Sequence, residues 1–266
     1  MGTFDIRLVA SDLDGTLLDS QARLPPDFPE IFGRMRAHGV AFAAVSGRQI
    51  HNMRSKFPGI EDEIYFAAEN GAYVTKAGEE LMSLELSRGD VAELLEAART
   101  VPNAYAVLSG KKFAYIENPD PVFLERLTSY SGYIKPVRDI SEVEGDTFYK
   151  FTVCDLSNPS TNALPRFAHL RGRFQIKVSG TRWMDVTHPL ADKGRALTLI
   201  QRLTGATRDQ TAAFGDYLND VEMLRNARHS YAMANAHPEI KAVASRTTYS
   251  NNECGVTRAL DAILPR

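Results

Sequence analysis

Two carboxylates stand one residue apart near the start of the chain. Asp12 and Asp14 follow the apolar run 6–11, which predicts a buried strand. In an open α/β sheet, ligands bind outside the carboxyl ends of the strands. Acidic side chains placed there need a cation, a cationic side chain or a substrate to relieve their repulsion. The pair therefore predicts a binding site for a charged ligand.

Three later segments carry polar groups at similar places. Ser46 follows the predicted strand 40–45, Lys193 opens the predicted helix 193–203, and Asp216 follows the predicted strand 211–214. In a parallel α/β sheet these loops converge on one edge, which would surround a single pocket with carboxylates, an ammonium and a hydroxyl. A lone Asp is more often a helix cap or turn residue. The combination instead predicts a site for Mg²⁺ and phosphate, with Asp12 and Asp216 as oxygen ligands.

The remaining pattern divides the chain into two kinds of unit. A helix carrying Phe28, Ile31, Phe32 and Met35, a helix 49–57 and a strand 64–68 continue a β-α-β rhythm, and Asn70-Gly71 predicts a hairpin turn. A different mixture follows: a helix capped by Ser87, strands 104–108, 113–116, 148–154, 174–179 and 183–186, and helices 123–130 and 161–170. After Pro189 the first rhythm returns, with a helix 219–226, a strand 230–233 and two more helical stretches. We therefore expect an α/β core from 1–81 and 189–266, interrupted by an α+β insertion at 82–188.

Four segments in this order resemble the motifs of the haloacid dehalogenase superfamily. They are Asp12-Leu13-Asp14-Gly15-Thr16, Ser46-Gly47-Arg48, Asp192-Lys193-Gly194 and Gly215-Asp216-x-x-Asn219-Asp220. The insertion between the second and third motifs is similar to the type IIB cap of the Cof-like sugar-phosphate phosphatases, as are the stretches 232–236 and 251–256. Ser46, Ala234 and Cys254 stand where many members have Thr, Gly and Asp, and none of these departures removes a catalytic group. The resemblance implies a Rossmann-like core with a parallel sheet plus an inserted α+β cap.

The resemblance also implies a reaction and a role for each motif. It implies a Mg²⁺-dependent phosphomonoester hydrolase that acts on a small phosphorylated metabolite, expected to be a sugar phosphate. Asp12 would attack phosphorus to form an aspartyl-phosphate, and the Asp14 side chain would protonate the leaving alkoxide and then activate water. Asp12, the Asp14 backbone carbonyl and Asp216 would hold the metal. Lys193 would neutralise charge, and Ser46 would donate to the phosphoryl group.

Further residues are expected around this centre. Leu13, Gly47, Arg48, Asn70 and Asn219 would bind phosphate or substrate, while Asp220 would orient Lys193 or a metal-bound water. Within the insertion, Arg182, Trp183 and Asp185 are expected near the substrate pocket because they lie close to its return to the core.

Composition limits the other classes of function. The 266 residues are 44% hydrophobic and 24% charged, with a formal net charge of -2 and no basic run, so we expect no nucleic-acid partner. No apolar stretch approaches membrane-spanning length and no signal pattern opens the chain, so we expect a cytoplasmic protein without a membrane partner. Cys154 and Cys254 show no metal or redox spacing and are expected to be reduced. The sequence does not indicate an oligomeric state.

Three alternatives remain open at this stage. A phosphotransferase or phosphomutase would form the same aspartyl-phosphate and pass it to a sugar hydroxyl, and a phosphate-release assay separates it from a hydrolase. A non-catalytic metabolite-binding regulator is disfavoured by the intact set of Asp12, Asp14, Lys193 and Asp216. A metal-dependent glycosyltransferase also uses Asp-x-Asp but has no use for Lys193 or the segment 215–220.

Overall fold

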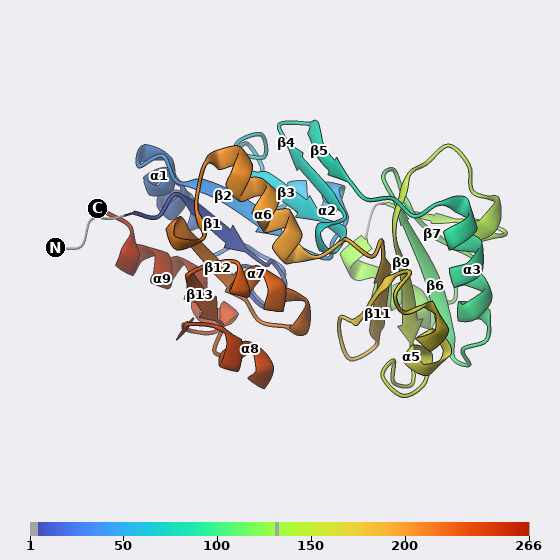
Figure 1. The fold of residues 1–266 in the computed structure, drawn as a ribbon. Coiled ribbons are helices and arrows are strands. Elements are labelled where there is room, and N and C mark those ends of the chain that lie inside the picture. The colour runs from blue at the N-terminus through green and yellow to red at the C-terminus, as the bar shows by residue number, and fades with distance from the viewer. Residues whose placement is uncertain (1–4, 131–132, 266) are drawn as a thin grey trace.

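The computed structural model describes residues 5–130 and 133–265, whose strands form two β-sheets at opposite ends of the molecule (Figure 1). The first sheet has eight strands in the spatial order β14 (Arg246–Thr247), β13 (His229–Ala232), β12 (Thr211–Gly215), β1 (Leu8–Ser11), β2 (Ala41–Val45), β3 (Tyr65–Ala68), β4 (Tyr73–Lys76) and β5 (Glu79–Ser83). The strands from β14 to β3 pair in parallel, and β4 and β5 complete the sheet in antiparallel fashion. The predicted α/β class with a parallel core sheet is confirmed.

Helices cover the central strands of the parallel sheet, and the residues of these strands are mostly apolar. All four residues of β1 and all five of β12 are buried. The covering helices are α1 (Phe28–Ala37), α2 (Ile50–Arg54), α6 (Lys193–Thr204), α7 (Val221–Arg225), α8 (Pro238–Val243) and α9 (Gly255–Ile263). Figure 1 shows α6 and α7 on the near face of the sheet. We call the eight-stranded sheet and these helices the first lobe.

A second lobe follows β5 and ends before α6. Its six strands lie in the order β10 (Gln175–Val178), β11 (Trp183–Thr187), β9 (Phe148–Asp155), β6 (Ala104–Gly110), β7 (Ala114–Ile116) and β8 (Ile134–Pro136). Its helices are α3 (Arg88–Arg99), α4 (Pro121–Leu124) and α5 (Ala163–Arg166). Phe151 and Val153 of β9 share a buried apolar cluster with residues of α3. Because side chains alternate along a strand, Lys150 and Thr152 point away from that cluster toward the first lobe.

Most predicted elements are present, with shorter helices than expected in several places. The hairpin turn at Asn70-Gly71 and the Ser87 cap are confirmed, the latter as a capping box with Asp90. The predicted helices 123–130, 161–170 and 219–226 are each a short α-helix joined to a 3-10 turn. Strands β5, β8 and β14 were not predicted. Among the described residues, no helix combines the length and apolar character needed to cross a bilayer.

Candidate active site

Three neighbouring parallel strands end at one cavity. β12, β1 and β2 lie side by side, so the residues that follow them, Asp216, Asp12 and Ser46, meet at one sheet edge. The cavity has a volume of about 490 Å³ and lies between the two lobes. Asp14, Asn70 and Asn219 line it from the first lobe, together with Gly47 and Arg48, and the second lobe supplies Lys150, Thr152, Trp183 and Asp185 among others.

Asp12 and Lys193 form a buried charge cluster with Asp220. Lys193 Nζ lies 2.6 Å from Asp12 Oδ1 and 2.6 Å from Asp220 Oδ1, and all three side chains are at most 8% exposed. Burial raises the pKa of Asp12 well above its ordinary value; the Lys193 ammonium opposes this rise and the neighbouring carboxylates add to it. Burial works against the charge of Lys193, but the two carboxylates prevail and raise its pKa. Lys193 is therefore a permanent ammonium beside the Asp12 carboxylate.

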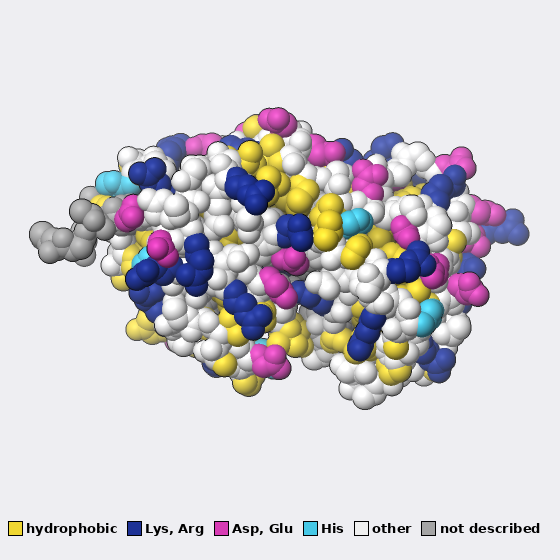
Figure 2. Space-filling view, in the orientation of Figure 1, with side chains coloured by type: hydrophobic (Ala, Val, Ile, Leu, Met, Phe, Trp, Pro, Cys, Tyr) yellow, Lys and Arg dark blue, Asp and Glu magenta, His cyan; other side chains and the backbone are white. Residues whose placement is uncertain are grey.

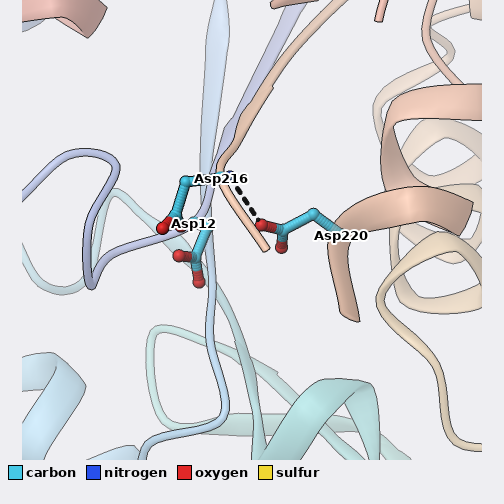
Figure 3. Close-up of side chains that lie close together, drawn as sticks. All are labelled: Asp12, Asp216 and Asp220. Atoms are coloured by element: carbon cyan, nitrogen blue, oxygen red, sulfur yellow. Dashed lines mark hydrogen bonds between the residues drawn. The ribbon is translucent and has the colours of Figure 1, made fainter. Parts of the chain in front are cut away.

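Asp216 faces Asp12 across the sheet edge (Figure 3). Its Oδ1 accepts a hydrogen bond from Thr16 Oγ1 at 3.0 Å, so the loop after β1 holds a residue that lies 200 positions later. Burial and the charge of Asp220 raise the pKa of Asp216 to about 6. Gly15, with φ +73°, passes so close that a Cβ there would lie 2.4 Å from Asp216 Oδ2. This turn needs glycine for both its conformation and its space.

The carboxylates of Asp12, Asp216 and Asp220 each place an oxygen within 4.8 Å of the others, which suits a hard cation. Both carboxylate oxygens of Asp220 already have partners within the protein. Oδ1 accepts from Lys193 Nζ, and Oδ2 accepts from the backbone N–H groups of Asp216 and Tyr217 at 2.9 and 3.1 Å. Asp12 and Asp216 are thus the side chains best placed to bind a metal. Neighbouring carboxylates contribute to the raised pKa values of both residues, and a cation bound between them would offset this repulsion.

Asp14 lies in different surroundings from Asp12. Its side chain is 56% exposed and forms a two-point ion pair with Arg48, with Nε to Oδ2 at 2.6 Å and Nη2 to Oδ1 at 2.5 Å. Arg48 also donates to Asn52 Oδ1. Arg48, which was expected to bind substrate, thus lines the cavity and is paired with Asp14, the expected proton donor.

The segment 46–48 turns at the mouth of β2. Ser46 is buried, and its Oγ accepts from the backbone N–H of Arg48 at 3.2 Å. A Cβ on Gly47 would lie 3.0 Å from Asn70 Oδ1, so the two segments are in close contact. Asn70 Oδ1 in turn accepts from Asn219 Nδ2 at 3.0 Å. The predicted binding residues at 47, 48, 70 and 219 therefore lie together, whereas the Leu13 side chain is fully buried in the core of the first lobe.

The second lobe supplies Asp185 and Trp183, which were expected near the pocket and line the cavity, whereas Arg182 is not among the lining residues. It also supplies Thr152 and Lys150, which the sequence did not single out. Thr152 Oγ1 donates to Asp185 Oδ1 at 2.8 Å, and Asp185 Oδ2 accepts from Asn70 Nδ2 at 2.9 Å. Lys150, 2% exposed, forms an ion pair with Glu69. Burial raises the pKa of Glu69, and the Lys150 ammonium opposes the rise. The one available signal for Lys150 was a lysine within the otherwise apolar start of β9.

Comparison with known proteins agrees with this geometry. A family model described as haloacid dehalogenase-like hydrolase matches residues 9–260. The chain is 33% identical over 263 residues to the 5-amino-6-(5-phospho-D-ribitylamino)uracil phosphatase YbjI of Escherichia coli, covering 97% of this chain and 96% of that one. The structure of SMU.1108c from Streptococcus mutans has a TM-score of 0.91 at 28% identity, covering 97% and 98% of the two chains. The HAD subclass IIB sugar phosphatase BT4131 shares the fold, with a TM-score of 0.82 at 20% identity over 97% and 100%.

These matches, together with the arrangement of charged groups at the sheet edge, show that the chain belongs to the haloacid dehalogenase-like hydrolases, as its motifs predicted. Within that family it is a phosphatase. Its two-lobed fold is that of subclass IIB.

Proposed function

We propose that this phosphatase is Mg²⁺-dependent and hydrolyses a phosphomonoester, with a sugar phosphate as the expected substrate, through an aspartyl-phosphate on Asp12. The observation that carries the proposal is the Asp12 carboxylate held at 2.6 Å by a buried ammonium, next to Asp216 and at the floor of a cavity of about 490 Å³. We further propose that residues 82–188 act as a cap over a core made of 1–81 and 189–266.

The donor set fits a magnesium ion. Carboxylate oxygens are its preferred protein ligands, and the Asp12 and Asp216 side chains with the Asp14 backbone carbonyl would hold it. When bound, the ion neutralises charge on the phosphate and the nearby carboxylates.

The chain's own residues then divide the reaction into two steps. The Asp12 carboxylate attacks phosphorus, and the bond from phosphorus to the leaving oxygen breaks as Asp14 protonates that oxygen. A water that loses a proton to Asp14 next attacks the phosphoryl group, which releases inorganic phosphate and restores Asp12. Lys193 stabilises the Asp12 carboxylate before attack, and Ser46 with the Gly47 N–H donates to the phosphoryl oxygens. Asp14 must part from Arg48 to do this, and an anionic substrate competes for that guanidinium.

The test is Asp12→Asn, which keeps the shape of the side chain and removes its nucleophilic charge. We expect phosphate release from p-nitrophenyl phosphate with Mg²⁺ to fall by at least about 10³-fold. Asp209→Asn, at an exposed carboxylate outside the cavity, is the matched control and should keep parental turnover. Substantial turnover by the Asp12 variant would refute the assignment of the nucleophile, and phosphate transferred to an added sugar without release would favour a phosphotransferase.

A further inference from the structure

A lysine of the second lobe reaches into the first. Lys150 of β9 places Nζ 2.7 Å from Glu69 Oε2, and both side chains are 2% exposed. The same ammonium donates a hydrogen bond to the backbone carbonyl of Gly47. Glu69 belongs to the 3-10 turn Glu69–Gly71 that follows β3. Lys150 therefore joins two loops of the first lobe that flank the cavity.

Because of the contact with Lys150, the backbone carbonyls of three consecutive residues, 46 to 48, each accept a hydrogen bond. Asn70 N donates to Ser46 O at 3.0 Å, Glu69 N donates to Arg48 O at 3.1 Å, and Lys150 supplies the donor for the carbonyl between them. A peptide group is planar, so holding its carbonyl also sets the direction of the N–H in the same plane. The N–H groups of Gly47 and Arg48 are thereby aligned.

This alignment extends to the Ser46 hydroxyl. The Arg48 N–H, in the same peptide plane as the carbonyl that Lys150 holds, donates to Ser46 Oγ at 3.2 Å. A hydroxyl that accepts there keeps its single hydrogen to donate elsewhere. Through the Gly47 carbonyl, Lys150 thus acts on the Ser46 hydroxyl. The Gly47 N–H lies in the peptide plane of the Ser46 carbonyl, which accepts from Asn70 N in the loop that carries Glu69.

The loop that carries Glu69 also depends on outside support. Glu69, Asn70 and Gly71 have φ values of 52°, 57° and 88°, in the left-handed region that side chains other than glycine rarely adopt. Such backbone persists where the surroundings over-determine it. Lys150 holds the Glu69 side chain and Asp185 holds that of Asn70, and both come from the second lobe.

We propose that Lys150 is a positioning residue, which aligns the phosphate-binding donors of segment 46–48 through the Gly47 carbonyl and its pair with Glu69. Stability alone does not explain the pair, because a buried ion pair is often no more stabilising than apolar side chains of similar volume. The kinetic part of this inference rests on the proposed function.

The test uses variants that separate stability from alignment. Lys150→Met leaves Glu69 buried without its partner, so it should lower the thermal midpoint as well as kcat. The double variant Lys150→Met/Glu69→Met removes both charges and should regain the midpoint. We expect kcat to stay about 10- to 100-fold low in both variants, and KM to rise by about the factor by which phosphate affinity falls. Lys177→Met is the matched control: it breaks another ion pair between the lobes, to Glu222 at 3.0 Å, outside segment 46–48, and should keep parental kcat.

Two further measurements do not depend on turnover. Amide hydrogen exchange in 46–48 and 69–71 should be faster in the double variant than in the Lys177→Met control. Affinity for inorganic phosphate with Mg²⁺, measured by calorimetry, should fall at least about tenfold in the double variant. A double variant with parental kcat, or with unchanged exchange, overturns the proposal. If the parent releases no phosphate, the proposed function fails by itself, and phosphate affinity then decides on Lys150: a tenfold loss supports the inference and parental affinity overturns it.

Discussion

Asp12 and Asp14 are the same residue type two positions apart, yet their surroundings differ. Asp12 is 6% exposed and lies against a buried ammonium, whereas the Asp14 side chain is 56% exposed and pairs with an arginine at the cavity wall. The Lys193 ammonium favours the ionised form of Asp12, which is the form that attacks phosphorus. A carboxylate on the open side of the cavity can reach solvent and a leaving group. The two environments thus suit the two different roles that we propose for Asp12 and Asp14.

Asp14→Asn tests this separation of roles. The amide cannot exchange a proton with the leaving oxygen, so hydrolysis of a sugar phosphate should fall by about 10²- to 10⁴-fold. The loss in the first step should be smaller with p-nitrophenyl phosphate, because its leaving group departs without protonation. Single-turnover release of the two leaving groups measures this difference. Equal losses for both substrates would count against Asp14 as general acid.

The raised pKa of Asp216 predicts how metal affinity depends on pH. Folding favours the protonated form, so in metal-free protein this group's contribution to stability is present below pH 3.8 and is lost as the pH rises through about 6. Mg²⁺ needs the ionised form and competes with the proton. The rise in thermal midpoint caused by Mg²⁺ should therefore be larger at pH 7.5 than at pH 5. Thermal melts in EDTA and in Mg²⁺ at both pH values measure it, and an equal rise would contradict Asp216 as a ligand.

At the scale of elements, the turn after β1 shapes the site as much as its side chains do. Gly15→Ala would force a Cβ to within 2.4 Å of Asp216 Oδ2 at a φ of +73°. The carboxylate can move aside, so stability should fall by only about 1–2 kcal/mol, from the backbone conformation. Turnover and Mg²⁺ affinity should fall at least about tenfold, because the displaced oxygen belongs to a proposed ligand of the metal.

Gly78→Ala is the matched control for that substitution. Gly78 has a similar φ of +80°, but a Cβ there meets nothing within 4 Å. Its cost in the free energy of unfolding, from urea melts, should match that of Gly15→Ala, while phosphate release stays parental. If both variants lose activity alike, backbone strain rather than the contact with Asp216 is responsible.

The parallel strands from β13 to β3 were predictable from sequence because they are largely buried and consist of short, mostly apolar runs ended by turn residues. β5 was not, since Glu79 and Glu80 interrupt any such run at the exposed edge of the sheet. Asp12, Ser46 and Asp216 could be placed together because parallel strands share an edge. The hydrogen bond between Asn70 and Asp185 could not be predicted, because it joins residues 115 positions apart and depends on how the two lobes pack against each other.

Across the whole molecule, the cavity exists because the lobes are held together. Gln49 Nε2 donates to Gly110 O at 3.1 Å, and Tyr73 stacks on Tyr149 with ring centroids 4.7 Å apart. The space-filling view shows hydrophobic as well as charged side chains along the boundary where the two lobes meet (Figure 2). Two lobes of one chain commonly move relative to each other, and we expect the lobes to part when substrate enters the cavity. The free energy difference between the open and closed arrangements of the lobes then contributes to the apparent affinity for substrate.

His51→Ala tests that contribution. His51 hydrogen-bonds Lys111 O at 2.9 Å and stacks on Tyr133 at 4.7 Å, so it joins the lobes without lining the cavity. Losing about 1 kcal/mol of closure energy lowers the closed fraction about fivefold where the closed form is the minority, and KM should rise by a similar factor. Saturating substrate restores closure, so kcat should change by less than about twofold. His169→Ala, at an exposed histidine of the second lobe, should leave both constants unchanged. A fall in kcat as large as the fall in kcat/KM would mean that His51 acts on the chemical step and not on closure.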